Sequence, residues 1–210
     1  MVLRRRILSS LGAQLGHPRG IRGRLLGRLL NRGNAELIAA AADEVATATE
    51  VADLGFVGGR GLDLWLARLG SNGRLHGVKI SCAMLSGARR RYRRHVKFGR
   101  LVLHQAGLED LPLPDDALDS VMTLNTLYFV GHLDRAFDEL SRVLRPGGHL
   151  VLGLGDPVAV ARMPVTAHGF RLRPVQDVVA TAMHAGFFPQ EQRRVGDGDD
   201  LSHLLVLIHA

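Results

Sequence analysis

The fold is decided by the stretch EVADLGFVGGRG, residues 50–61. Residues 51–54 are mostly apolar and predict a short strand. Glycines follow at positions 55, 58, 59 and 61, in a turn where a positive φ costs little and a ligand can approach the backbone closely. Leu62, Leu66 and Leu69 then share one face of a predicted helix. The stretch therefore predicts a strand that enters a helix through a glycine-rich turn.

Strands and helices alternate through the rest of the chain. Apolar runs predict strands at 51–54, 75–80, 101–105, 118–124, 149–154, 187–195 and 203–208. Apolar residues at helical spacing predict helices at 21–45 (with an interruption near Gly33), 62–69, 83–94, 133–144 and 174–185. The clearest helix places Leu133, Phe137 and Leu140 on one face and ends before Pro146. Residues 155–173 are expected to form a long loop, and the last two strands a hairpin.

This succession predicts an α/β fold with a Rossmann-like, doubly wound, mostly parallel seven-stranded sheet and a C-terminal antiparallel β-hairpin. In such sheets the ligand sits at the carboxyl ends of the strands, at the switch point beside the first strand. We therefore expect one pocket surrounded by the residues that follow Asp53, Ile80, Gln105 and Leu124.

Composition limits the class of protein. The chain has 210 residues, of which 46% are hydrophobic and 22% charged, and this profile excludes a disordered chain and a disulfide scaffold. Cys82 is the single cysteine, so there is no internal disulfide and no cysteine-based zinc site. No apolar run approaches the roughly 18 residues of a membrane span. We expect a cytoplasmic protein, and the ten histidines show no His-x-x-x-His pair that would predict a metal site.

Positive charge is concentrated in two places. The net charge is +7, and residues 1–34 contain eight arginines and no acid. A second cluster runs from Arg89 to Lys97. Two interpretations stay open: solvated helix faces in an arginine-rich composition, or a surface for an anionic substrate, a membrane or nucleic acid. We expect residues 1–34 to form a basic arm whose leucine-rich helix packs over the pocket as a lid, and 35–210 to form the Rossmann-like domain.

Four further motifs accompany the glycine-rich turn: GVKIS at 77–81, LEDLPLPD at 108–115, LDSVMTLN at 118–125 and RVLRPGGHL at 142–150. In this order and spacing, residues 21–210 resemble the class I S-adenosylmethionine-dependent methyltransferases. The similarity is greatest to small-molecule enzymes of the ubiquinone/menaquinone C-methyltransferase kind. The resemblance implies methyl transfer, S-adenosylmethionine as the cofactor and a small-molecule acceptor.

The resemblance also implies roles for individual positions. The methionine part of the cofactor would lie against Asp53, Gly55, Phe56, Gly58 and Gly59. Its ribose and adenine would lie against Lys79, Ile80, Gly107 and Leu108, and its sulfonium would lie near Asn125. The acceptor would contact Asn125, Tyr128 and His168, with His132 and Tyr128 as the catalytic candidates. His132 opens the helix after the fourth strand, where a general base would reach the acceptor.

Three positions depart from the family pattern. Val57 replaces the middle glycine of the turn, Lys79 replaces the acid that holds the ribose hydroxyls, and Gly107 replaces the adenine-binding Asp. An ammonium group cannot accept hydrogen bonds from two hydroxyls, so we expect weak cofactor binding. The alternatives are an enzyme independent of S-adenosylmethionine, of the cyclase or isomerase type, and a non-catalytic binding protein on the same fold.

Overall fold

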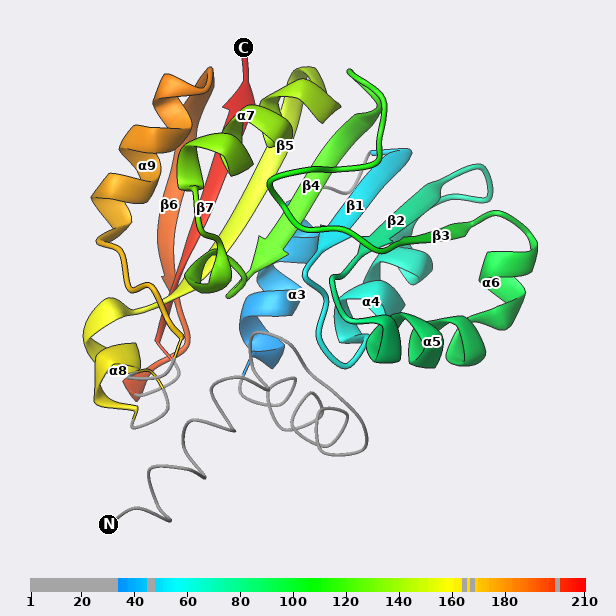
Figure 1. Ribbon diagram of the computed structural model, residues 1–210, viewed down its shortest axis with the longest axis horizontal. Helices are drawn as coiled ribbons and strands as arrows, with labels where there is room; N and C mark the ends of the chain where they lie inside the picture. Colours follow the sequence, from blue (N-terminus) through cyan, green and yellow to red (C-terminus); the bar gives the residue numbers. More distant parts are fainter. Residues whose placement is uncertain (1–33, 45–47, 164–165, 167–168, 199–200) are drawn as a thin grey trace.

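The computed structural model describes residues 34–44, 48–163, 166, 169–198 and 201–210 (Figure 1). Its strands are β1 Glu50–Leu54, β2 Arg74–Val78, β3 Leu101–His104, β4 Leu118–Leu124, β5 Leu144–Gly155, β6 Phe187–Val195 and β7 Ser202–His209. Its helices are α3 Ala35–Asp43, α4 Arg60–Arg68, α5 Cys82–Arg91, α6 Arg93–Lys97, η1 Leu127–Phe129, α7 Leu133–Val143, α8 Pro157–Arg162 and α9 Val175–His184. The predicted arm at 1–34 lies outside the described residues except for Asn34, and its role as a lid stays a prediction.

The strands form one seven-stranded sheet in the order β3-β2-β1-β4-β5-β7-β6. Neighbours from β3 to β5 pair in parallel, whereas β7 is antiparallel to both β5 and β6. The strand order reverses between β1 and β4, which is the switch point where α/β sheets bind ligands. The predicted α/β class, the mostly parallel sheet and the C-terminal antiparallel strands are confirmed.

Helices cover both faces of the sheet (Figure 1). On one face α7 and α9 pack on the sheet around Phe137, Leu140 and Phe187. On the other, α3, α4 and α5 enclose Leu62 and the fully buried Trp65. Each covering helix buries the apolar side of its sequence pattern, and this burial of apolar surface is the main force that holds the layers together.

Three elements differ from the sequence prediction. Strand β5 begins at Leu144, earlier than expected, because Leu144 pairs with Leu118 before the register shifts. The helix predicted at 83–94 is divided at Tyr92 into α5 and α6. The predicted loop at 155–173 contains α8, which Asp156 caps by accepting hydrogen bonds from the backbone amides of Val158 and Ala159. This cap satisfies two amides that a helix start leaves open, and so stabilises a helix of only six residues.

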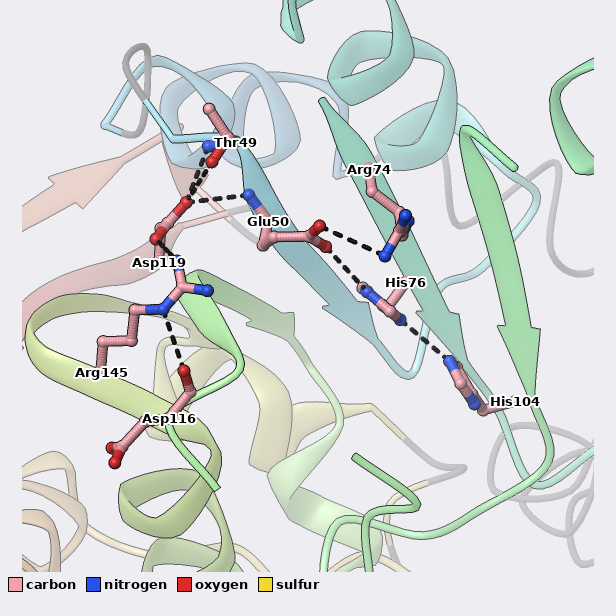
Figure 2. Close-up of polar contacts among 8 residues, drawn as sticks. All are labelled: Thr49, Glu50, Arg74, His76, His104, Asp116, Asp119 and Arg145. Carbon is pink, nitrogen blue, oxygen red and sulfur yellow. Dashed lines mark hydrogen bonds and ion pairs between the residues drawn. The ribbon is translucent and has the colours of Figure 1, made fainter. Parts of the chain in front are cut away.

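The amino ends of the strands are joined by a charged network (Figure 2). One carboxylate oxygen of Asp119 accepts hydrogen bonds from the amides of Thr49 and Glu50 and from the Thr49 hydroxyl, at 2.8–2.9 Å, and the other binds Arg145. Partial burial opposes ionisation of Asp119, but these hydrogen bonds outweigh it and lower its pKa to about 2. The network fixes the starts of β1, β4 and β5 at the edge opposite the expected ligand site.

Candidate functional site

The glycine-rich turn after β1 depends on glycine for its backbone conformation at three positions and for space at two of them. Gly55, Gly58 and Gly59 have φ of +83°, +64° and +86°. A Cβ on Gly55 would lie 2.1 Å from Oγ1 of Thr126, and one on Gly59 would lie 2.6 Å from the Tyr92 hydroxyl. Val57 is not among the residues with positive φ, so the turn accommodates its β-branched side chain without backbone strain.

The turn is braced from behind by α5, a support that the sequence analysis did not identify. Arg91 donates to the carbonyl of Gly58 and pairs with Asp63 at 2.6 Å. The hydroxyl of the buried Tyr92 lies 2.8 Å from the carbonyl of Gly59 and 2.7 Å from Asp63. Part of the basic cluster at 89–97 therefore holds the turn. Its other cations, Arg89, Arg90, Arg93, Arg94 and Lys97, lie exposed.

Asp53 and Lys79 form a buried, oppositely charged pair beneath the turn. Their residues are only 4% and 8% exposed, and the Lys79 ammonium donates to the carbonyl of Gly55 at 3.1 Å. Burial raises the pKa of Asp53 to about 7 and lowers that of Lys79 to about 8, while the opposite charge of the partner resists each shift. The Asp53 carboxylate also explains Gly61, where a Cβ would lie 2.4 Å from it. Lys79 thus folds back toward β1.

The positions predicted to flank the ribose and adenine lie together. Ile80 is 47% exposed, and a Cβ on Gly107 would lie 3.8 Å from its Cδ1. The side chain of Gln105 donates to the Ile80 carbonyl and accepts from the Cys82 thiol, which ties the ends of β2 and β3 together. Leu108 is buried beneath them.

Asn125 joins the ends of β4 and β5 to the start of α3. Its side-chain oxygen accepts from the amide of Gly155 at 3.0 Å, and its side-chain nitrogen donates to Asn34 at 3.1 Å. Its φ of +53° is uncommon for a residue other than glycine, although asparagine tolerates it better than most. Thr126 follows and donates from its hydroxyl to the carbonyls of Leu54 and Leu124. The predicted cofactor turn and the predicted acceptor segment are therefore in direct contact.

The other predicted site residues are more widely distributed. Tyr128 is buried, its hydroxyl donates to the Gly155 carbonyl at 3.2 Å, and burial raises its pKa. Its ring packs against Phe129 and Phe170. Phe56 is a core residue, so only its backbone is available to a ligand. His132 is exposed at the start of α7, and His168 lies outside the described residues.

A chain of hydrogen-bonded groups on three neighbouring strands also escaped the sequence analysis (Figure 2). Glu50 lies 3.2 Å from Nε2 of His76, and Nδ1 of His76 lies 3.0 Å from Nε2 of His104. Burial lowers the pKa of both histidines. The residues are 26 and 28 positions apart, and only the strand register brings them together, so local sequence gives no signal for them.

The fit of S-adenosylmethionine differs between its parts. The turn at 55–59 offers the close approach that the methionine portion needs. The end of β2 offers an ammonium bound to a backbone carbonyl where two ribose hydroxyls need acceptors.

Within the described ranges, no group of three or more His, Cys, Asp and Glu side chains is placed to hold a metal ion. Over the same ranges, no helix has the length and apolar character needed to cross a membrane.

The fold and its switch-point turn define a Rossmann-like α/β domain, and comparison with known proteins shows what this domain is similar to. Residues 52–152 match the family described as a methyltransferase domain. A ubiquinone/menaquinone biosynthesis C-methyltransferase, UbiE, from Proteus mirabilis is 37% identical over 108 residues, which cover 50% of this chain and 43% of that protein. The chain thus matches less than half the length of this relative.

Solved structures extend the likeness to the whole sheet. The geranyl diphosphate C-methyltransferase of Streptomyces coelicolor, solved with geranyl diphosphate and S-adenosyl-L-homocysteine, has a TM-score of 0.71 at 18% identity over 94% of this chain and 86% of that one. The [4+2]-cyclase SpnF has a TM-score of 0.68 at 18% identity over 82% and 80%. Residues 52–152, just under half of the chain, therefore match a methyltransferase domain, and the similar sequences and structures support a class I S-adenosylmethionine-dependent methyltransferase fold.

Proposed function

We propose that this chain transfers a methyl group from S-adenosylmethionine to a small-molecule acceptor at the carboxyl edge of the sheet. The observation that carries the proposal is the contact between the turn at Gly55 and the segment that begins at Asn125. It supports the proposal because the family resemblance assigns the cofactor to the turn and the acceptor to this segment. The proposal is also supported by similar proteins and structures that are named as methyltransferases. S-adenosylmethionine supplies an electrophilic methyl group, and the protein must then orient the two reactants and exclude water.

In this proposal the chain's own residues divide the work. Gly55, Gly58 and Gly59 admit the methionine part of the cofactor, and Asn125 holds the acceptor segment in place. Tyr128 is a positioning residue, because its hydroxyl is already bound to the Gly155 carbonyl. His132 takes up a proton from the acceptor, and His168 stays a predicted substrate contact.

We further propose that Lys79 weakens cofactor binding. An acid at this position would accept two hydrogen bonds from the ribose, and losing one charge-assisted bond costs about tenfold in affinity. The ammonium also adds positive charge near a cationic sulfonium. The Lys79–Gly55 hydrogen bond supports this, since it directs the side chain into the space between the ends of β1 and β2.

Titration calorimetry with S-adenosylmethionine and S-adenosylhomocysteine tests the proposal on the natural protein and on Lys79→Asp. We expect weak binding by the natural protein and binding about tenfold tighter by the variant. Val57→Gly should add a smaller gain that comes from space alone, because residue 57 does not need a positive φ. Low-micromolar binding by the natural protein, unchanged in Lys79→Asp, would contradict the role of Lys79.

The second candidate function is a reaction, or a binding role, that does not use S-adenosylmethionine. Two observations favour it: the ammonium at the ribose position and the likeness in fold to a protein named as a [4+2]-cyclase. A double variant, Lys79→Asp with Val57→Gly, separates the two candidates. If this variant folds and still binds neither ligand, methyl transfer is excluded and the second candidate stands.

A further inference from the structure

A groove lies between α9 and the strands β6 and β7, on the side of the molecule that Figure 1 labels α8, α9 and β6. It has a volume of about 730 Å³, within the range of roughly 300–1,000 Å³ typical of small-molecule sites. Most of its lining is apolar, including Pro157, Leu172, Val175, Val179, Ala180 and Met183. Leu172 and Met183 are 37% and 52% exposed, so this apolar surface is open to a ligand.

The groove also contains an unsatisfied polar group. His203 lines it and is only 8% exposed. Nε2 of His203 lies 3.1 Å from a carboxylate oxygen of Asp156, while its Nδ1 is buried with no hydrogen-bond partner among the described residues. A buried imidazole nitrogen without a partner is costly in a native structure and calls for an explanation.

Asp156 determines which ring nitrogen of His203 carries the proton. Its other carboxylate oxygen caps α8, and the hydrogen bonds from the Ala159 amide and from His203 lower the pKa of Asp156. In the neutral imidazole, the carboxylate accepts from Nε2–H, and the lone pair of Nδ1 is then left as a hydrogen-bond acceptor. A ligand that satisfies this nitrogen must therefore donate a hydrogen.

The charge of the groove narrows the ligand class. Arg173 is the cation among its lining residues, and no acidic side chain lines it. Arg173 is fixed by donating to the carbonyls of Leu127 and Val130 at 2.7 and 2.8 Å. A hydroxyl supplies the hydrogen that Nδ1 needs, and the positive charge of Arg173 in the lining favours a weakly acidic hydroxyl over an amine. Nδ1 itself has almost no accessible surface, so a ligand in the groove reaches it only after neighbouring lining side chains move. Met183 and Gln192 are exposed members of that lining.

From these contacts we propose that the groove binds an apolar small molecule carrying a weakly acidic hydroxyl, such as a phenol, which donates a hydrogen bond to Nδ1 of His203. The site is distinct from the cofactor turn and does not depend on methyl transfer. It is next to the predicted acceptor segment, because Gly155, which precedes Asp156, bonds to both Asn125 and Tyr128.

Fluorescence titration of the full chain with 2-naphthol and with 2-methoxynaphthalene, both without S-adenosylmethionine, tests the proposal. The two probes share an apolar body, but only 2-naphthol can donate. We expect 2-naphthol to bind about tenfold more tightly, the value of a hydrogen bond to a buried unpaired acceptor. Equal affinities, or no binding of either probe up to its solubility limit, would overturn the proposal.

Two variants locate the site. His203→Phe should abolish the difference between the probes and leave 2-methoxynaphthalene binding within a few-fold. Ala180→Trp should block both probes by filling the groove, whereas His184→Trp, which adds the same bulk to α9 outside the lining, should leave both affinities unchanged. If His203→Phe does not fold, the affinity difference between the two probes and the two tryptophan variants still test whether the probes bind in the groove. Binding that persists unchanged in Ala180→Trp would place the probes elsewhere and refute the site.

Discussion

Asn125 shows how one residue serves both the fold and the site. It ends β4 at the switch point with φ of +53°, where a side chain other than glycine costs roughly 1–2 kcal/mol, less for asparagine. Its two side-chain hydrogen bonds, to Gly155 and Asn34, offset that cost. A strained residue at the meeting point of three segments is common in functional sites.

Replacing Asn125 separates these two contributions. Asn125→Gly relieves the backbone but leaves the Gly155 amide without its partner, which should lower the free energy of unfolding by about 1–3 kcal/mol. Asn125→Ala loses the same bonds and keeps the strain, so it should be less stable than Asn125→Gly by about 1 kcal/mol. Urea unfolding measures both values.

Asp116 provides the matched control, since it is exposed with φ of +50°. Asp116→Ala and Asp116→Gly should differ by a similar amount, while neither loses a bond at the site. Equal stability of Asn125→Ala and Asn125→Gly would show that the left-handed conformation is not maintained in solution.

At the scale of elements, β1, β2 and β3 are linked on one face by Glu50, His76 and His104. Burial lowers the pKa of both histidines below the usual value, so the folded state disfavours their charged forms. The unfolded chain then binds more protons as the pH falls through about 6.5, and folding stability decreases in that direction. The two rings would also repel if both were protonated, because Nδ1 of His76 and Nε2 of His104 lie 3.0 Å apart.

A double variant, His76→Gln with His104→Gln, tests this coupling. The natural protein should lose more free energy of unfolding between pH 7.5 and 5.5 than the variant, because the variant has no histidine to protonate between these strands. His184→Gln, at an exposed position on α9, should follow the natural protein. Parallel pH profiles for the natural protein and the double variant would rule out a role for the pair.

The elements that the sequence predicts well are those with strong local patterns. The apolar spacing of α7 and the strand–turn–helix at β1 agree with the structure almost to the residue. The start of β5 and the short helix α8 were missed, because pairing with Leu118 and capping by Asp156 fix them, and neither is a periodic signal.

The candidate site was predictable in position but not in contacts. The positions of the turn glycines and of Lys79 could be predicted from the sequence, because each lies near the end of a predicted strand. The direction of the Lys79 side chain toward Gly55, and the bracing of the turn by Tyr92, depend on packing between separate segments. Periodicity carries no information on such contacts.

For the whole molecule, the two edges of the sheet differ in kind. The amino edge is fixed by Asp119 and its hydrogen bonds to Thr49 and Glu50. The carboxyl edge carries the glycine turn, the left-handed Asn125 and the buried pair of Asp53 and Lys79. The hydrogen bonds thus hold the strand starts together at one edge, while the turns at the other edge are where an α/β sheet presents its ligand site.

Hydrogen–deuterium exchange in saturating S-adenosylhomocysteine tests the location of that site most directly, with natural protein and Lys79→Asp compared at millimolar ligand. We predict slower exchange of the amides at 54–60, 79–82 and 125–128, more pronounced in Lys79→Asp, and no change at Thr49, Glu50 or Asp119. Protection confined to the amino edge, or no protection at 54–60 in either protein, would contradict a methyltransferase-type cofactor site on this domain.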